Sequence, residues 1–99
     1  MNNTLFNPSS LAIKRCDTVV WTHQQPNVPH SVTSGQLGAG NAGAEFDSTG
    51  GLGFGKLMNN GETFSHTFNN AGTFPYHCIV HGAGGPNQPP MIGTITVSP

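Results

Sequence analysis

Hydrophobic and polar residues alternate with a period of two in several short stretches of the chain. Val19 and Trp21 share one phase in "DTVVWT", and alternating apolar residues also mark positions 11–13, 28–32, 64–68, 74–78 and 95–97. Such runs, rich in threonine, valine and aromatic residues and bounded by Asn-Gly, Ala-Gly or proline, are typical of half-buried antiparallel strands. No segment has the pattern of an amphipathic helix. The sequence therefore predicts an all-β fold, a Greek-key β-sandwich in a single domain over residues 1–99.

Residues 35–55 interrupt this pattern with eight glycines and no regular period. A loop of this length in so small a domain is usually either functional or a mobile surface excursion. We expect a surface connection here. Two interpretations remain open, a segment that flanks a functional site and a tolerated insertion.

The charge content of the chain narrows the classes of partner. Only 7% of the residues are charged, and the formal net charge is −1 with neutral histidines. Binding to nucleic acid or to an anionic membrane needs clustered cations, so neither is expected. No apolar stretch approaches the roughly 20 residues that a membrane span requires. The opening "MNNTLFNPSS" lacks the basic start and apolar run of a secretory signal.

Candidate chemistry is concentrated in "YHCIVHGAGGPNQPPMIG", residues 76–93. Cys78 shares phase with Phe74 and Tyr76, so its sulfur is expected to point into the sandwich. His81 follows three residues later, where a turn can bring its imidazole back beside the sulfur. Cys-x-x-His alone is a weak signal, because a buried free cysteine near a surface histidine is common.

Two further residues strengthen this signal. Met91 shares phase with Ile95 and Val97 and is expected to face inward at the mouth of the sandwich. His30 lies in phase with the apolar residues on either side of it, and a Greek-key connection can place it beside Cys78. Two imidazoles, one thiolate and a weak thioether form the ligand set of a mononuclear copper electron-transfer site. The predicted copper ligands are His30, Cys78, His81 and Met91.

The chain resembles the plastocyanin-like cupredoxins, the small blue copper proteins, over nearly its whole length. The resemblance rests on "FNPSSLAIKRCDTVVWT", "PHSVTS", "FDSTGG", "FSHTFNNAGTFPYHCIVH" and "MIGTITV". It implies a Greek-key sandwich that holds one type 1 copper ion through His30, Cys78, His81 and Met91. It also implies that His81 reaches the surface as the point of electron entry, and that the backbone N–H of Ser31 supports the cysteine sulfur. A monomeric domain in the periplasm or extracellular space is the expectation that follows.

The chain departs from the family pattern at two places. Nine residues separate His81 from Met91, where members of this type commonly have four. We expect Gly82, Gly84 and Gly85 to turn this longer loop and Pro86, Pro89 and Pro90 to stiffen it, which leaves the strength of the Met91 bond open. Cys16 stands where the family usually has glycine, so backbone strain is expected there. We interpret it as an incidental free thiol.

The remaining histidines have structural interpretations at this point. His66 is expected in or near the core, between two phenylalanines on one face. His77 faces away from Cys78, which favours a solvated side chain. His23 is expected at the surface, and His23 or water is the substitute ligand to consider if Met91 lies too far from the site.

Three functional classes remain open. The first is an electron carrier or a relay domain of a larger copper protein, with a redox partner docking near His81. We expect the partner to dock on an apolar surface of this chain around His81, which includes Pro86, Pro89, Pro90 and Leu37. The reaction rate should then depend only weakly on ionic strength. The second is a small copper enzyme whose open copper position binds a small nitrogen oxide or similar ligand. The third is a zinc or structural site, which would leave the thioether of Met91 without a use.

Overall fold

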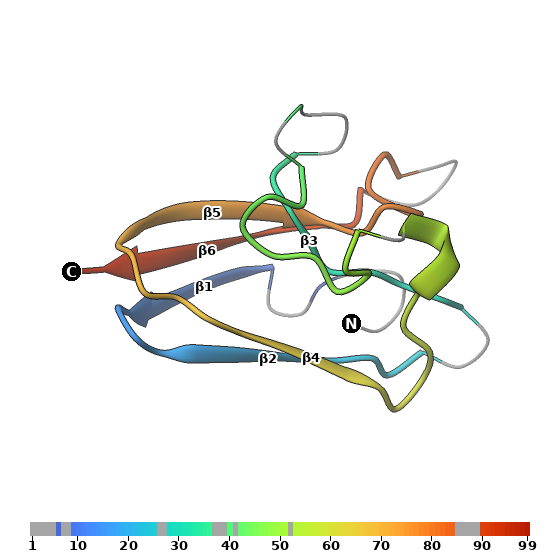
Figure 1. Cartoon of the computed structure of the whole chain (residues 1–99), viewed down its shortest axis with the longest axis horizontal. Coiled ribbons are helices and arrows are strands. Elements are labelled where there is room, and N and C mark those ends of the chain that lie inside the picture. Colours follow the sequence, from blue (N-terminus) through green and yellow to red (C-terminus); the bar gives the residue numbers. More distant parts are fainter. Residues whose placement is uncertain are drawn as a thin grey trace.

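The chain folds into two stacked sheets (Figure 1). The structure is a computed structural model, and it describes residues 6, 9–25, 28–36, 40, 42–51, 53–84 and 90–99. The larger sheet has the strand order β1 (Ser10–Lys14), β6 (Ile92–Ser98), β5 (Gly72–His77) and β3 (Thr33–Ser34). The smaller sheet pairs β2 (Thr18–Thr22) with β4 (Thr63–Thr67). A short 3₁₀ helix, η1, covers Gly53–Lys56. The predicted β-sandwich is confirmed, and the described residues contain no helix long and apolar enough to cross a membrane.

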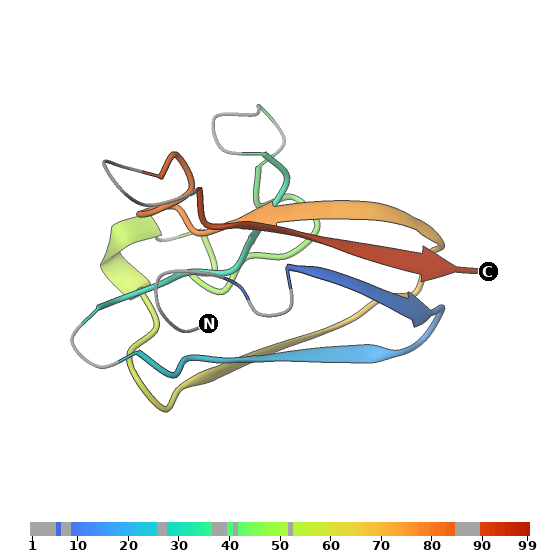
Figure 2. The ribbon, with the colours of Figure 1, turned by 180° about the vertical axis from the view of Figure 1, so that it is seen from behind.

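Strand pairing differs from the sequence prediction in two respects. All strands were expected to be antiparallel, but β1 runs parallel to β6, with Leu11 opposite Ile95 (Figure 2). Every connection except the one from β5 to β6 passes between the two sheets, and this crossing brings the first and last strands side by side in the same direction. Residues 28–32 were expected to form a strand, yet the strand β3 begins only at Thr33. Before it, His30 pairs with Met58 in an isolated bridge.

The core lies between the two sheets and is built from the inward phase of each strand. In β2 the burial alternates, with Val19 and Trp21 buried and their neighbours exposed. Trp21 contacts four aromatic rings, with centroid distances from 5.4 to 6.5 Å, which come from Phe46, Phe64, Phe68 and Tyr76. Burial of each large apolar side chain contributes roughly 1.5–3 kcal/mol, so this cluster fixes how the sheets stack.

The glycine-rich segment runs beside the stretch that carries His30. The Ser34 N–H donates to the Phe46 carbonyl at 2.9 Å, and the Ser48 N–H donates to the Val32 carbonyl at 2.8 Å. His30 and Met58 exchange two backbone hydrogen bonds, of 3.1 and 2.8 Å. Of the two interpretations, this arrangement favours a segment that flanks the site, because it holds residues 30–34 in place without a long strand of their own.

Candidate metal centre

Three metal-ligating side chains that lie far apart in the sequence meet at one end of the sandwich. The Nδ1 atoms of His30 and His81 lie 3.9 and 3.5 Å from the Sγ of Cys78. One donor atom from each residue falls within 4.8 Å of the others. Cys78 and His30 are fully buried, and His81 is partly exposed. The predicted cluster of His30, Cys78 and His81 is therefore present.

Local chain geometry explains how Cys78 and His81 come together. Cys78 follows β5 directly and continues its alternation, so its side chain enters the core. The chain then turns through His81, whose carbonyl accepts the Gly84 N–H at 2.9 Å. Gly84 has a φ of 71°, in the left-handed region that glycine adopts without strain. This turn swings the His81 imidazole back over the sulfur.

Backbone hydrogen bonds bring Met91 to the same place. The Met91 N–H donates to the His81 carbonyl at 3.0 Å, and the Cys78 N–H donates to the Met91 carbonyl at 3.1 Å. The Met91 side chain is fully buried. The longer loop is thus closed at its base, although Gly85, Pro86 and Pro89, which were expected to turn and stiffen it, lie outside the described residues.

The orientation of His30 is fixed by a glutamine. Its Nε2 lies 2.7 Å from Gln25 Oε1, and an amide oxygen can only accept, so Nε2 carries the proton. The Nδ1 lone pair therefore faces Cys78. Burial, with His23 and His81 nearby, lowers the pKa of His30 to about 4. The ring is consequently neutral near pH 7, as a metal ligand must be.

The pKa of His81 is lowered as well. Burial lowers the pKa of its imidazole below the ordinary value of 6.5. Its ring centroid lies 5.0 Å from that of His30, with the planes 64° apart. Both imidazoles thus place an Nδ1 atom toward one sulfur.

Ser31 joins the segment that carries His30 to the loop that follows Cys78. Its backbone N–H donates to Cys78 Sγ at 3.4 Å, which confirms the support for the sulfur that the family resemblance implied. Its hydroxyl accepts the Ile79 N–H at 3.0 Å. The same hydroxyl lies 3.0 Å from Thr33 Oγ1, which in turn donates to Asp47 Oδ1 at 3.3 Å. The sulfur and the loop that carries it are therefore held from the neighbouring segment.

Two of the three remaining histidines differ from expectation. His23 was expected at the surface, and His77 was expected to be solvated, but both are buried. The His77 Nδ1–H donates to the Gly35 carbonyl at 2.9 Å, because the glycine-rich segment covers that face of β5. His23 uses both ring nitrogens in contacts with the backbone and is therefore not a substitute ligand. His66 packs between Phe46 and Phe68 as a near-core residue, as predicted.

Cys16 is an exposed free thiol with a φ of 75°, so the strain expected of a non-glycine residue there is confirmed. It belongs to the turn that joins β1 to β2, and it takes no part in the metal cluster.

Gln25 was missed by the sequence analysis. Glutamine is common in polar loops, and nothing in "THQQPNVPH" distinguishes this one from Gln24 beside it.

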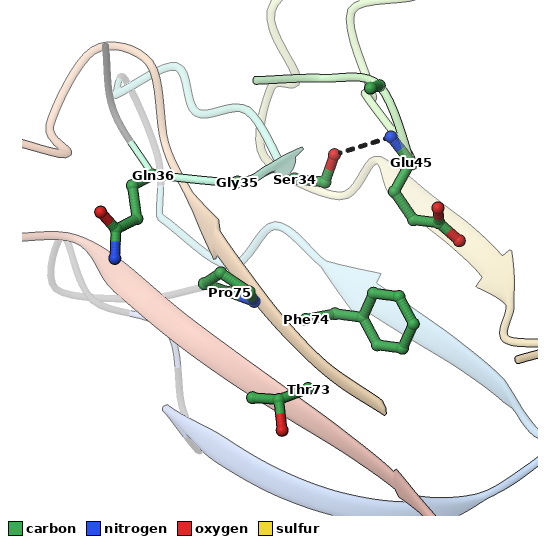
Figure 3. A pocket seen from close by; sticks show the side chains of 8 residues that line it. Ser34, Gly35, Gln36, Glu45, Thr73, Phe74 and Pro75 are labelled. Carbon is green, nitrogen blue, oxygen red and sulfur yellow. Dashed lines mark hydrogen bonds between the residues drawn. The ribbon is translucent and has the colours of Figure 1, made fainter. Parts of the chain in front are cut away.

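A surface pocket with a volume of about 470 Å³ lies apart from the metal cluster, along the edge of β3 and β5 (Figure 3). At its rim the Glu45 N–H donates to Ser34 Oγ at 3.1 Å. None of the residues lining it belongs to the cluster; they are Ser34, Gly35, Gln36, Ala44, Glu45, Thr73, Phe74 and Pro75.

The donor set at the cluster suits copper. A thiolate and imidazoles bind both copper and zinc, but a buried methionine whose backbone is bonded to both His81 and Cys78 favours copper. Cys78 and His30 are fully buried, and the outer nitrogen of His30 is hydrogen-bonded to Gln25, so the residues present fit this ion.

Comparison with known proteins agrees with this chemistry. Residues 1–98 match the family described as copper binding proteins, plastocyanin/azurin family. A plastocyanin from Scenedesmus fuscus is 33% identical over 93 residues, which are 94% of this chain and 86% of that protein.

Solved structures give the same result. The chain resembles a novel purple cupredoxin from Nitrosopumilus maritimus, with a TM-score of 0.69, 30% identity, and coverage of 95% of this chain and 82% of the other. It also resembles a reduced variant of amicyanin, with a TM-score of 0.64, 30% identity, and coverage of 97% and 75%. The chain belongs to the plastocyanin/azurin family of copper-binding proteins, as a plastocyanin-like cupredoxin whose cofactor is one copper ion.

Proposed function

We propose that this protein transfers single electrons through a mononuclear type 1 copper site whose ligands are His30, Cys78, His81 and Met91. The observation that carries the proposal is the convergence of two imidazole Nδ1 atoms on Cys78 Sγ, at 3.9 and 3.5 Å. Membership of the copper-binding family supports it. The burial of Met91, and the hydrogen bonds that tie its backbone to His81 and Cys78, support Met91 as the fourth ligand.

When bound, the copper ion supplies a one-electron Cu(II)/Cu(I) couple. The protein keeps the donors in nearly one arrangement for both oxidation states. Gln25 fixes the His30 ring, Ser31 supports the sulfur, and the two backbone hydrogen bonds of Met91 hold the loop closed. Less rearrangement of the donors means a smaller barrier to electron transfer, which is the property a carrier needs.

The surface near His81 suits contact with a redox partner. His81 is the partly exposed member of the cluster, and Val80 beside it is 39% exposed. Pro90 is exposed as well, whereas Leu37, Pro86 and Pro89 lie outside the described residues. With 7% charged residues in the chain, docking here would depend on apolar contact, so the reaction rate should change little with ionic strength.

This proposal covers a soluble carrier and a relay domain of a larger copper protein, in the periplasm or extracellular space. An enzyme acting on a small nitrogen oxide would instead need an open copper position. Met91 as a fourth ligand occupies that position. Addition of nitric oxide should therefore leave the copper spectrum of the protein unchanged, whereas a new spectrum would favour the enzyme.

The decisive experiment is a visible and electron paramagnetic resonance spectrum of the metal-free protein loaded with one equivalent of Cu(II). An intense thiolate-to-copper band with narrow hyperfine splitting is expected. The band should disappear in Cys78→Ser and persist in Cys16→Ser, the matched control at an exposed thiol. Met91→Ala should retain copper with an altered spectrum and potential. Colour that survives Cys78→Ser would overturn the proposal, and a colourless wild type would favour the zinc or structural site.

A further inference from the structure

His23 is a buried histidine whose two ring nitrogens both contact the loop that leads to His30. The Gln25 N–H donates to its Nδ1 at 3.2 Å, and its Nε2 lies 2.6 Å from the Val28 carbonyl oxygen. A carbonyl only accepts and an N–H only donates, so the ring is the neutral tautomer with its proton on Nε2. His23 therefore connects two points of the loop: its Nδ1 accepts from Gln25, and its Nε2–H donates to Val28.

The backbone of His23 is itself attached to the end of the smaller sheet. Its N–H donates to the Glu62 carbonyl at 2.9 Å, and its carbonyl accepts the Gly61 N–H at 2.8 Å. These bonds continue the pairing of β2 with β4 beyond Thr22. The imidazole is thus fixed at its base by the sheet, so its ring can hold the more irregular loop.

Gln25 transmits this position to the metal cluster. Its backbone N–H is held by His23, and its Oε1 accepts the His30 Nε2–H at 2.7 Å. The His23 and His30 rings also pack directly, with centroids 4.6 Å apart and planes tilted by 36°. His23 therefore contacts the face of the His30 ring and fixes the residue that holds its edge.

We propose that His23 is a positioning residue for copper, which sets the direction of the His30 Nδ1 lone pair through Gln25 and through ring contact. The inference rests on the proposed function, in which His30 is a copper ligand. The ring supplies a rigid acceptor and a rigid donor on opposite sides, an arrangement that an apolar side chain of the same size cannot reproduce. Loss of these contacts leaves His30 free to rotate about its bond to the metal.

The test compares His23→Phe, which keeps an aromatic ring without its nitrogens, with His66→Phe as the matched control. His66 lies in β4 and packs on core aromatic rings away from the cluster. We expect His23→Phe to change the reduction potential and the copper hyperfine splitting and to speed copper loss to a chelator about tenfold. His66→Phe should leave the potential and splitting unchanged. Wild-type values in His23→Phe would overturn the inference.

A double variant tests the route through Gln25. Gln25→Ala should itself shift the potential, and His23→Phe added to it should shift the potential less than it does in the wild type. Shifts that add fully would show that His23 does not act through Gln25.

Two conservative variants decide the matter if His23→Phe does not fold. His23→Asn places an oxygen near the position of Nδ1, where it can accept the Gln25 N–H. His23→Gln places a donor near the position of Nε2, where it can reach Val28. The potential of His23→Asn should lie closer to wild type than that of His23→Gln, and the reverse order would overturn the inference. Absence of a thiolate-to-copper band in the wild type would instead defeat the proposed function, so the two failures are distinguishable.

Discussion

The Ser31 backbone N–H donates to the Sγ of Cys78 across 3.4 Å, although the two residues lie 47 positions apart. The same serine accepts the Ile79 N–H through its hydroxyl at 3.0 Å. One residue on the histidine segment thereby fixes both the sulfur and the peptide that follows it. This contact links the two halves of the copper site before any metal binds.

Removal of the Ser31 hydroxyl should loosen this link. In Ser31→Ala the partly buried Ile79 N–H loses its acceptor, which costs about 1 kcal/mol of folding free energy. Urea unfolding of the metal-free protein measures this loss. Thr18→Ala is the control, because its hydroxyl pairs with Thr67 at an exposed position, and its cost should be small. An equal cost in both variants would contradict the role of Ser31.

The charge at position 25 should tune the reduction potential. In Gln25→Glu a carboxylate would accept the His30 Nε2–H, make the imidazole a stronger donor and stabilise Cu(II). We expect the potential to fall by tens of millivolts, against about 59 mV for a tenfold change in a one-electron couple. Voltammetry measures this shift. Gln24→Glu adds the same charge at the adjacent exposed residue, and a similar fall there would point to a general charge effect.

Cys16→Gly should stabilise the protein. Cys16 has a φ of 75°, a conformation that costs a residue with a Cβ atom about 1–2 kcal/mol. Thermal unfolding should show a gain of about 1 kcal/mol for Cys16→Gly. Cys16→Ala removes the thiol and keeps the Cβ, so its stability should match the wild type. Both variants should abolish disulfide-linked dimers on non-reducing gels. A gain in the alanine variant as large as in the glycine variant would assign the effect to the thiol.

Gly93→Ala should destabilise the sandwich. A Cβ at Gly93 would overlap the ring of Tyr76 on the paired strand. Tyr76 is itself packed against Phe6 and Trp21 and has little room to move. Overpacking of this kind costs about 1–3 kcal/mol. Gly40→Ala is the control, because nothing lies within 4 Å of its added methyl group. Comparable unfolding midpoints for the two variants would refute the overlap.

The metal-free protein should lose stability as the pH falls from 6.5 to 4. The folded pKa of His30 is about 4, whereas the ordinary pKa of histidine is 6.5, so in this window the unfolded chain binds a proton that the folded protein does not. Proton binding by the unfolded state favours unfolding, by up to about 3 kcal/mol below pH 4, and the penalty is absent above pH 6.5. Urea unfolding at pH 7.5, 5.5 and 4 measures this.

The depressed pKa of His81 acts in the same direction. His30→Asn should show a smaller loss over this range than the wild type. An unchanged loss in that variant would assign the pH dependence to other groups.

The sequence by itself determined the class of fold and the chemistry of the site. Period-two alternation predicts strands with one buried face, because successive side chains in a strand point to opposite sides. Cys78 stands at the end of a strand and His81 lies in the turn that follows, three residues later, so local geometry brings them together. Residue type alone identifies thiolate, imidazole and thioether as copper donors.

Only the tertiary structure decided which neighbours these residues meet. The phase of a strand shows that a residue faces inward, but not which segment lies opposite, because that depends on pairing between distant parts of the chain. The parallel contact of β1 with β6, the covering of His77 by Gly35, and the burial of His23 all arise in this way. Polar residues such as Gln25 carry no periodic signal, and their roles depend on atoms brought within about 3 Å by the fold.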